Sequence, residues 1–222
     1  MIVAGGSGSR MGAGMPKQFR SLANRPVLWW SMKAFHDEDT STRIILVLPK
    51  DFITLWKDFF DSLPEEDRFF HEITSGGGSR GESVKNGLKL VDSQSLVAIH
   101  DGARPLVTPE MIAKGWETAA KFEAAIPVVP VTDSLREITK VPEESRSVDR
   151  SRFVAVQTPQ VFDSEKLKQA YRLAGEKSFT DDAAVMEAAG YDIRLFPGNH
   201  RNIKITNPED LAIAELIMQK DG

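Results

Sequence analysis

Short apolar runs alternate with longer helical segments along this chain, and that alternation limits the folds it can adopt. The runs that predict strands are Arg43–Pro49, Ser95–Asp101, Ala124–Val131, Tyr191–Gly198 and Arg201–Thr206. The segments that predict helices are Pro26–His36, Asp51–Leu63, Ser79–Val91, Pro109–Phe122, Ser164–Ala174, Asp181–Ala189 and Pro208–Gln219. Strands that alternate with helices form βαβ units. The sequence therefore predicts an α/β fold: a Rossmann-like, mostly parallel sheet flanked by helices, in a single domain that spans residues 1–222.

One stretch interrupts this alternation. It contains two strand-like runs, Ser134–Lys140 and Ser147–Val156, which are separated by the polar turn VPEES. The pattern predicts a β-hairpin inserted at about residues 132–156. Such a hairpin either extends the sheet at the surface or forms an arm that packs on a second subunit.

Composition narrows the class of protein. The net charge of −4 is unlike the basic footprint of nucleic-acid-binding domains, so we expect no nucleic-acid partner. The absence of cysteine excludes disulfides, zinc thiolates and a cysteine nucleophile, and the four histidines have no metal-ligand spacing. No apolar run approaches the roughly 18 residues of a membrane span, and no signal-peptide pattern is visible. We therefore expect a cytoplasmic protein without a membrane partner.

The first apolar residues lead directly into a glycine-rich segment, AGGSGSR at residues 4–10. Glycine has no Cβ to keep an anion away from backbone N–H groups. Arg10 and Lys17 add two cations beside those amides, an arrangement that suits a triphosphate. The segment lacks the P-loop pattern, and Arg10 stands where a dinucleotide-binding fingerprint needs its third glycine. The glycines alone are weak evidence for a phosphate site, and Arg10 and Lys17 strengthen it.

Two further turns follow apolar strands. SGGGSRGES (residues 75–83) has three successive glycines, which suit a flat ring lying against backbone. HDGARP (residues 100–105) places Asp101 at the end of a strand, where a carboxylate suits a divalent metal or a ribose hydroxyl. An ion pair between Asp101 and Arg104 is the purely structural alternative. Because open α/β sheets bind ligands at the carboxyl ends of their strands, we expect both turns at the ligand edge.

A third cation lies near the end of the chain, in NIKIT (residues 202–206). In a strand, Lys204 would face away from Ile203 and Ile205, because successive side chains alternate. It is either a solvated lysine at a sheet edge or a further cation for the phosphates.

These segments, in this order, resemble the 2-C-methyl-D-erythritol 4-phosphate cytidylyltransferases, nucleotidyltransferases of the non-mevalonate isoprenoid pathway. The motifs that carry the resemblance are AGGSGSRMG, GGGSRGESV, HDGARPLV, PVTDSL, SVDRSRFVAVQTPQVF, FTDDAAVMEAAG and NIKITNPEDLAIAE. The resemblance implies transfer of CMP from CTP to 2-C-methyl-D-erythritol 4-phosphate, with release of pyrophosphate. It also implies Mg²⁺ held mainly by the CTP phosphates, with Asp101 a possible neighbour, and a homodimer whose inserted hairpins cross between subunits.

The resemblance also implies roles for individual residues. Those implied in catalysis are Arg10, Lys17 and Lys204. Those implied in nucleotide binding are Ala4, Gly5, Gly6, Gly77, Gly78, Arg80, Ser83 and Asp101. Those implied in acceptor binding are Asp101, Arg104, Thr158, and, from the arm of the partner subunit, Ser134 and Arg150.

Three features depart from the family pattern. Gly78 stands where the family often has an acidic residue, so we do not expect that side-chain contact to cytosine, and a backbone contact at Gly78 is the alternative. Ser134 stands where threonine is usual, which keeps a hydroxyl. Only three residues precede Ala4, so we expect a short first strand.

Two other functions fit the same residues. One is transfer of CMP to ribitol 5-phosphate, by a related cytidylyltransferase. The other is a nucleotide-binding module without catalysis, although two cations beside the α-phosphate favour an enzyme.

Overall fold

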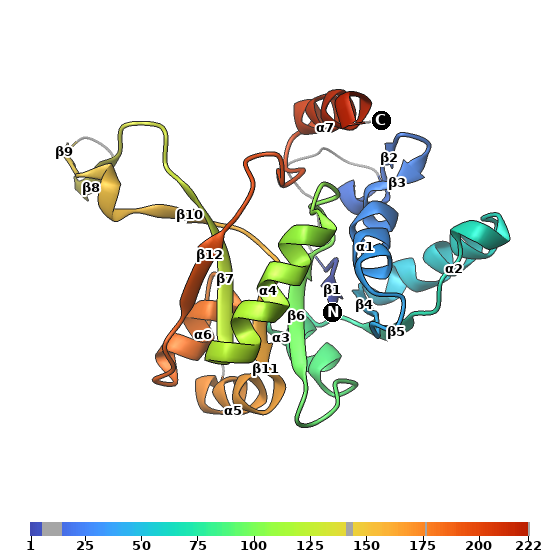
Figure 1. Cartoon of the computed structure of the whole chain (residues 1–222), viewed down its shortest axis with the longest axis horizontal. Coiled ribbons are helices and arrows are strands. Elements are labelled where there is room, and N and C mark those ends of the chain that lie inside the picture. Colours follow the sequence, from blue (N-terminus) through green and yellow to red (C-terminus); the bar gives the residue numbers. More distant parts are fainter. Residues whose placement is uncertain (6–14, 141–143, 176, 222) are drawn as a thin grey trace.

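The structure is a computed structural model, and it describes residues 1–5, 15–140, 144–175 and 177–221. Its centre is an eight-stranded sheet in the order β10-β7-β11-β6-β1-β4-β5, in which β12 also pairs with β7 (Figure 1). The strands of this sheet are β1 (Ile2–Val3), β4 (Ile45–Leu48), β5 (Glu72–Ser75), β6 (Leu96–Asp101), β7 (Ala124–Pro130), β10 (Val154–Val156), β11 (Gln160–Asp163) and β12 (Arg194–Pro197).

Every segment predicted to be helical contains a helix. The helices are α1 (Val27–Glu38), α2 (Ile53–Asp61), α3 (Arg80–Leu88), α4 (Pro109–Phe122), α5 (Ser164–Ala174), α6 (Asp182–Ala188) and α7 (Pro208–Asp221). Local capping explains the predicted bounds of α4 and α5, because Thr108 and Asp163 accept hydrogen bonds from backbone N–H groups of their first turns. Within the described ranges, no helix is long and apolar enough to cross a membrane.

The sheet has a parallel half and a mixed half, which meet at β6. On one side, β6, β1, β4 and β5 are all parallel, and β1 has only two residues, as expected. On the other side, β11 lies antiparallel between β6 and β7, and β10 pairs antiparallel with β7. β12 is parallel to β7. The mostly parallel sheet is thus confirmed, with β10 and β11 as its antiparallel members.

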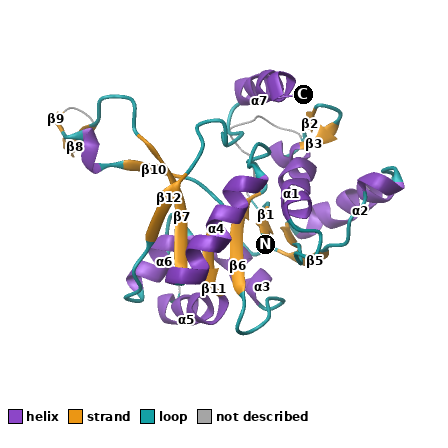
Figure 2. Cartoon of the chain, in the orientation of Figure 1, coloured by secondary structure: helices purple, strands orange, loops and turns teal. Residues whose placement is uncertain are grey.

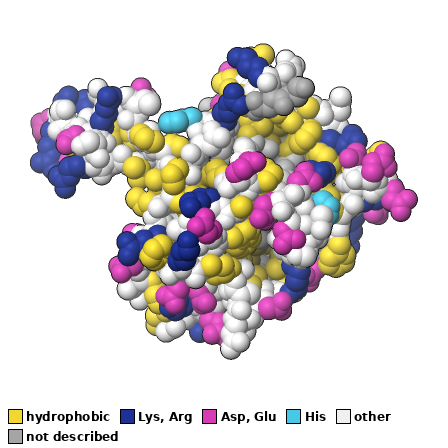
Figure 3. All heavy atoms as spheres, viewed as in Figure 1, with side chains coloured by type: hydrophobic (Ala, Val, Ile, Leu, Met, Phe, Trp, Pro, Cys, Tyr) yellow, Lys and Arg dark blue, Asp and Glu magenta, His cyan; other side chains and the backbone are white. Residues whose placement is uncertain are grey.

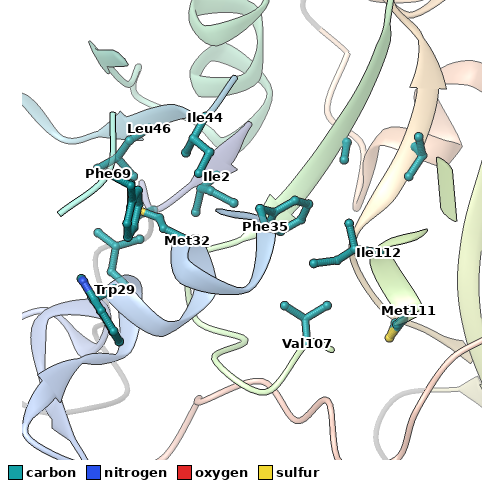
Figure 4. Close-up of a cluster of buried hydrophobic side chains, with 14 of the residues drawn as sticks. Ile2, Trp29, Met32, Phe35, Ile44, Leu46, Phe69, Val107, Met111 and Ile112 are labelled. Atoms are coloured by element: carbon teal, nitrogen blue, oxygen red, sulfur yellow. The ribbon is translucent and has the colours of Figure 1, made fainter. Parts of the chain in front are cut away.

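Helices cover both faces of the sheet (Figure 2), and alternating side chains of the strands build an apolar core on each face. Ile2 and Leu46 point into the core covered by α1, α2 and α4, where they pack with Met32, Phe35 and Ile112 (Figure 4). Their strand neighbours, including Val3 and Val47, point into the core covered by α3, α5 and α6. Because both faces are covered, the strands are apolar throughout, which explains their continuous β-branched runs.

The final predicted strand is wrong. Residues 201–206 form no strand, because their backbone groups bond to turns rather than to a ladder: Ile205 N–H donates to the Ala103 carbonyl, and Ile203 N–H donates to that of Arg201. The expected alternation holds for Lys204 and Ile205 but not for Asn202, which is fully buried although it should share the side of Lys204. Ile205 is buried beside α7, whereas Lys204 is exposed.

The inserted hairpin is present with different bounds. It consists of β8 (Arg136–Lys140) and β9 (Glu144–Ser147), which pair only with each other. The predicted second strand, Ser147–Val156, is instead divided among the end of β9, a 3₁₀ turn at Arg150–Arg152, and β10 of the main sheet. Figure 1 shows this hairpin, hereafter the arm, projecting from the body beyond β7 and β10.

Three strands were not predicted from the sequence. They are β11, which directly precedes α5, and the two strands of a small hairpin before α1, β2 (Ser21–Leu22) and β3 (Arg25–Pro26). The small hairpin supplies Leu22 to a third apolar cluster, in which it packs beneath α7 with Val27, Ile205 and Ala214.

Candidate active site

The carboxyl ends of the parallel strands bring the predicted segments to one edge of the sheet. Ala4 and Gly5 follow β1, the three glycines follow β5, and Asp101 is the last residue of β6. β1 pairs with β6 on one side and with β4 on the other, and β4 pairs with β5. The edge is therefore a continuous row in which the loops after β1, β5 and β6 meet.

The loop after β1 is anchored at both of its described ends. Ala4 N–H donates to the Val47 carbonyl at 3.0 Å. The buried Gln18 side chain donates to the Ala4 carbonyl at 2.5 Å. Lys17 precedes Gln18 in the same 3₁₀ turn, Lys17–Phe19, so this hydrogen bond keeps Lys17 near the end of β1. The predicted site residues Gly6 and Arg10 lie outside the described residues.

Ser83 joins the first loop to the second. Its hydroxyl donates to the Ser79 carbonyl at 2.9 Å and accepts from Gly77 N–H at 3.1 Å. A Cβ at Gly5 would lie 3.0 Å from this hydroxyl oxygen, and a Cβ at Gly76 would lie 2.8 Å from it. Glycine is therefore needed in both loops for their backbones to approach. The buried Ser83 hydroxyl acts within the fold, holding the turn that we expected to read cytosine.

An acidic group does reach the second turn, although residue 78 is glycine. The carboxylate of Glu82 accepts from Gly78 N–H at 2.7 Å, and Glu82 N–H donates to the hydroxyl of Ser79, the N-cap of α3. A Cβ at Gly77 would lie only 2.4 Å from the Cβ of Glu82. The sequence analysis missed Glu82, but the pattern Ser-x-x-Glu before a helix is a capping signature that could have indicated it.

We expect Gly77→Ala to raise the KM for CTP, the nucleotide that the resemblance implies, about tenfold, because the added methyl group must displace Glu82 and with it the glycine turn after β5. Gly81→Ala is the matched control. At Gly81 a Cβ makes only an ordinary contact, 3.8 Å from the Tyr171 ring, and alanine favours the helix. Steady-state kinetics of both variants test this, and equal effects at the two positions would contradict it.

Asp101 is the centre of a charged cluster at the end of β6. Its carboxylate lies 2.7 Å from the Lys204 ammonium and 3.6 Å from Arg104 Nε. Burial alone would raise the pKa of Asp101, but Lys204, Arg80 and Arg104 outweigh that effect and lower it to about 2. Asp101 is therefore ionised at neutral pH. Three predicted site residues, Asp101, Arg104 and Lys204, thus come together from segments about 100 residues apart.

Arg80 is held by a second network. It donates to the fully buried carboxylate of Asp182 at 2.5 Å, and the Tyr171 hydroxyl donates to the other oxygen of that carboxylate at 2.5 Å. Burial opposes the charge of Arg80, but Asp182 and Asp101 together raise its pKa. The sequence analysis assigned no role to Asp182 or Tyr171, because nothing local shows that α5 and α6 bring them to α3.

The two arm residues lie apart from the Asp101 cluster. Arg150 is exposed and donates to the Thr132 carbonyl at the root of the arm, and Ser134 is also exposed. Within the described residues, no hydrogen bond or ion pair joins either side chain to Asp101, Arg104 or Lys204. Thr158 differs again: it is buried, and its hydroxyl contacts His100 and the backbone of Asp101.

Comparison with known proteins gives one consistent result. The family model described as 2-C-methyl-D-erythritol 4-phosphate cytidylyltransferase matches residues 1–220. A protein of that name from Bacteroides thetaiotaomicron is 46% identical over 220 residues, which are 98% of each chain. Another, from Caldanaerobacter subterraneus, is 40% identical over 99% of this chain and 98% of its own.

Solved structures agree with the sequence relatives. The crystal structure of the cytidylyltransferase from Thermus thermophilus has a TM-score of 0.77 and 31% identity, covering 99% of this chain and 98% of that one. The 4-diphosphocytidyl-2C-methyl-D-erythritol synthase from Anaerococcus prevotii has a TM-score of 0.82 and 29% identity, covering 98% and 96% respectively.

Proposed function

Because the chain belongs to the 2-C-methyl-D-erythritol 4-phosphate cytidylyltransferase family, we propose that this edge of its sheet is where it transfers CMP from CTP to 2-C-methyl-D-erythritol 4-phosphate, releasing pyrophosphate. The observation that supports this site best is the ionised Asp101 paired with Lys204, at the edge formed by the two glycine loops. A largely buried carboxylate with cations on several sides is typical of a site that arranges charge.

The reaction needs positioning and charge stabilisation. A phosphate oxygen of the acceptor attacks the α-phosphorus of CTP, a new P–O bond forms, and the bond to the leaving pyrophosphate breaks. No covalent enzyme intermediate is required. Lys17, Arg10 and Lys204 offset the negative charge that gathers around the α-phosphorus in the transition state. Asp101 pairs with Lys204 at 2.7 Å, which fixes the position of the ammonium.

The glycine loops supply the nucleotide site. Without side chains at Gly5, Gly76 and Gly77, the backbones after β1 and β5 come close enough to enclose a flat base, and Glu82 and Ser83 hold the second loop in place. Arg80, fixed by Asp182, adds a cation beside this loop. Arg104 and Asp101 face the acceptor side.

Mg²⁺ is proposed to enter with CTP, bound mainly by the phosphates. In the described part of the chain, no group of three or more histidine, aspartate or glutamate side chains could hold a metal. Asp101 already faces Lys204 and Arg104, so it does not fit the role of a resident metal ligand in this arrangement. When bound, the metal would supply positive charge to the phosphates. The protein's own contribution to charge stabilisation comes from Lys17, Arg10 and Lys204.

The arm supports a homodimer. Its two strands pair only with each other and are exposed along their whole length, and an isolated two-stranded hairpin is marginally stable in water. Ile138 on the arm is 66% exposed, and Phe153 at its root is 47% exposed. Figure 3 shows hydrophobic side chains gathered where the arm leaves the body. We propose that this surface packs on a second copy, and that Ser134 and Arg150 complete the partner's acceptor site.

The substrates can be tested directly by measuring pyrophosphate release. We expect turnover with CTP and 2-C-methyl-D-erythritol 4-phosphate, and at least a hundredfold lower kcat/KM with ATP or GTP, because a purine does not fit between the glycine loops. Ribitol 5-phosphate is the control acceptor, and preferred turnover with it would assign the chain to the related reaction. CTP binding without any turnover would identify a binding module instead.

A further inference from the structure

His100 is a buried polar residue that the reaction described above does not use. It lies in β6 between Ile99 and Asp101, is completely buried, and meets the Phe35 ring of α1 edge-on at 5.3 Å. Because successive strand residues point to opposite faces, His100 points toward the α1 core while Asp101 points to the other side. A polar side chain in this place requires hydrogen-bond partners.

The imidazole has a partner at each nitrogen. Nδ1 lies 3.0 Å from the Thr158 hydroxyl, and Nε2 lies 3.1 Å from the Arg104 carbonyl oxygen. The same Thr158 hydroxyl oxygen accepts from Asp101 N–H at 3.1 Å. His100 and Thr158 therefore connect both ends of the turn that carries Asp101 and Arg104.

These contacts fix the positions of the protons. A carbonyl oxygen only accepts, so Nε2 must carry a hydrogen. Burial lowers the pKa of His100 to about 4, although Asp101 opposes the shift, so the ring is neutral at pH 7 and Nδ1 is an acceptor. The Thr158 hydroxyl then donates to Nδ1 and accepts from Asp101 N–H. Each donor in this chain has an acceptor.

Thr158 also reaches the segment that carries Lys204. Its backbone carbonyl accepts from the buried Asn202 side chain at 2.9 Å, and the Asn202 carbonyl accepts from Arg104 at 2.8 Å. The side chain of Thr158 thus holds the backbone at Asp101, while its carbonyl holds the side chain of Asn202, two residues before Lys204. Both sides of the Asp101–Lys204 ion pair are tied to this one residue.

We propose that His100, as its Nε2–H tautomer, and Thr158 are positioning residues that hold Asp101 against Lys204 and so place the Lys204 ammonium for the reaction. Thr158, which the sequence led us to expect at the acceptor, acts here through the backbone of Asp101. The proposal rests on the proposed function, because the ion pair it serves is part of that site.

A double-mutant cycle tests the positioning role. Thr158→Val keeps the shape of threonine but removes the hydroxyl, and we expect it to lower kcat about tenfold with little change in the KM for CTP. Thr158→Ser, which restores the hydroxyl, should recover most of that loss. In a Lys204→Ala background, Thr158→Val should lower kcat by less than twofold, because the group it places is already gone. If the tenfold loss recurs in that background, Thr158 does not act through Lys204 and the proposal is wrong.

Histidine NMR tests the proton arrangement without relying on activity. In full-length protein labelled with ¹⁵N-histidine, the signal lost in His100→Gln should show a neutral ring with Nε2 protonated at pH 7. A ring protonated at Nδ1, or at both nitrogens, would overturn the proposal even if Thr158→Val failed to fold. If the wild-type chain transferred no CMP, the proposed function would fail, whereas the tautomer would still be decided by this measurement.

Discussion

Replacing Lys17 with alanine is expected to lower kcat by between a hundredfold and a thousandfold while CTP binding weakens far less. The reason is that a cation at the α-phosphate acts mainly on charge that develops in the transition state, where one such contact is typically worth ~3 kcal/mol or more. Arg10→Ala should behave in the same way. Steady-state kcat, together with CTP affinity measured by calorimetry, separates the two effects.

Lys57→Ala is the matched control for this experiment. Lys57 is an exposed lysine on α2, a helix that contains none of the predicted site residues. It should leave both quantities unchanged. A Lys17→Ala enzyme that binds CTP a hundredfold more weakly but turns over at the normal saturated rate would show that Lys17 only binds nucleotide.

The second large effect concerns the arm. Arg150→Ala and Lys17→Ala should each be nearly inactive alone. If Arg150 serves the partner's site, a mixed dimer of these two chains has one site that carries both lesions and one that carries neither. Activity should therefore rise from near zero to about half of the wild-type value for each mixed dimer, after the two proteins have exchanged subunits.

Exchange itself must be measured, for example with two affinity tags that allow only mixed dimers to be recovered. A double variant, Lys17→Ala with Arg150→Ala on one chain, mixed with the wild type, controls for simple dilution. If recovered mixed dimers stay at the level of the single variants, the arm acts within its own subunit.

Local signals explain which elements the sequence predicts well. α4 and α5 have the predicted bounds because their caps, Thr108 and Asp163, lie within three residues of the groups they bind. β11 was missed because only its place between β6 and β7 makes Gln160–Asp163 a strand. Residues 201–206 were wrongly expected to be a strand. Their polar and apolar residues alternate because Ile205 packs under α7 whereas Lys204 pairs with Asp101, and neither contact requires a strand.

The same distinction applies to the site. The glycine loops and Asp101 could be predicted because a strand and the turn after it are adjacent in sequence. The Arg80–Asp182 pair could not, because its residues are 102 positions apart and meet only when α6 packs beside α3. The contact between Thr158 and His100 could not be predicted either. Whether the Thr158 hydroxyl faces a substrate or His100 depends on how β11 pairs with β6, which the sequence does not show.

The meeting of a parallel and a mixed half of the sheet at β6 has an evolutionary consequence. The glycine loops belong to the parallel half, whereas the two ends of the arm continue from β7 and into β10, which pair with each other at Pro130 and Val154. The chain between these two paired residues contributes no strand to the parallel half. On the proposed role of the arm, descendants of one ancestral enzyme can diversify in the sugar phosphate they accept while inheriting the same nucleotide donor.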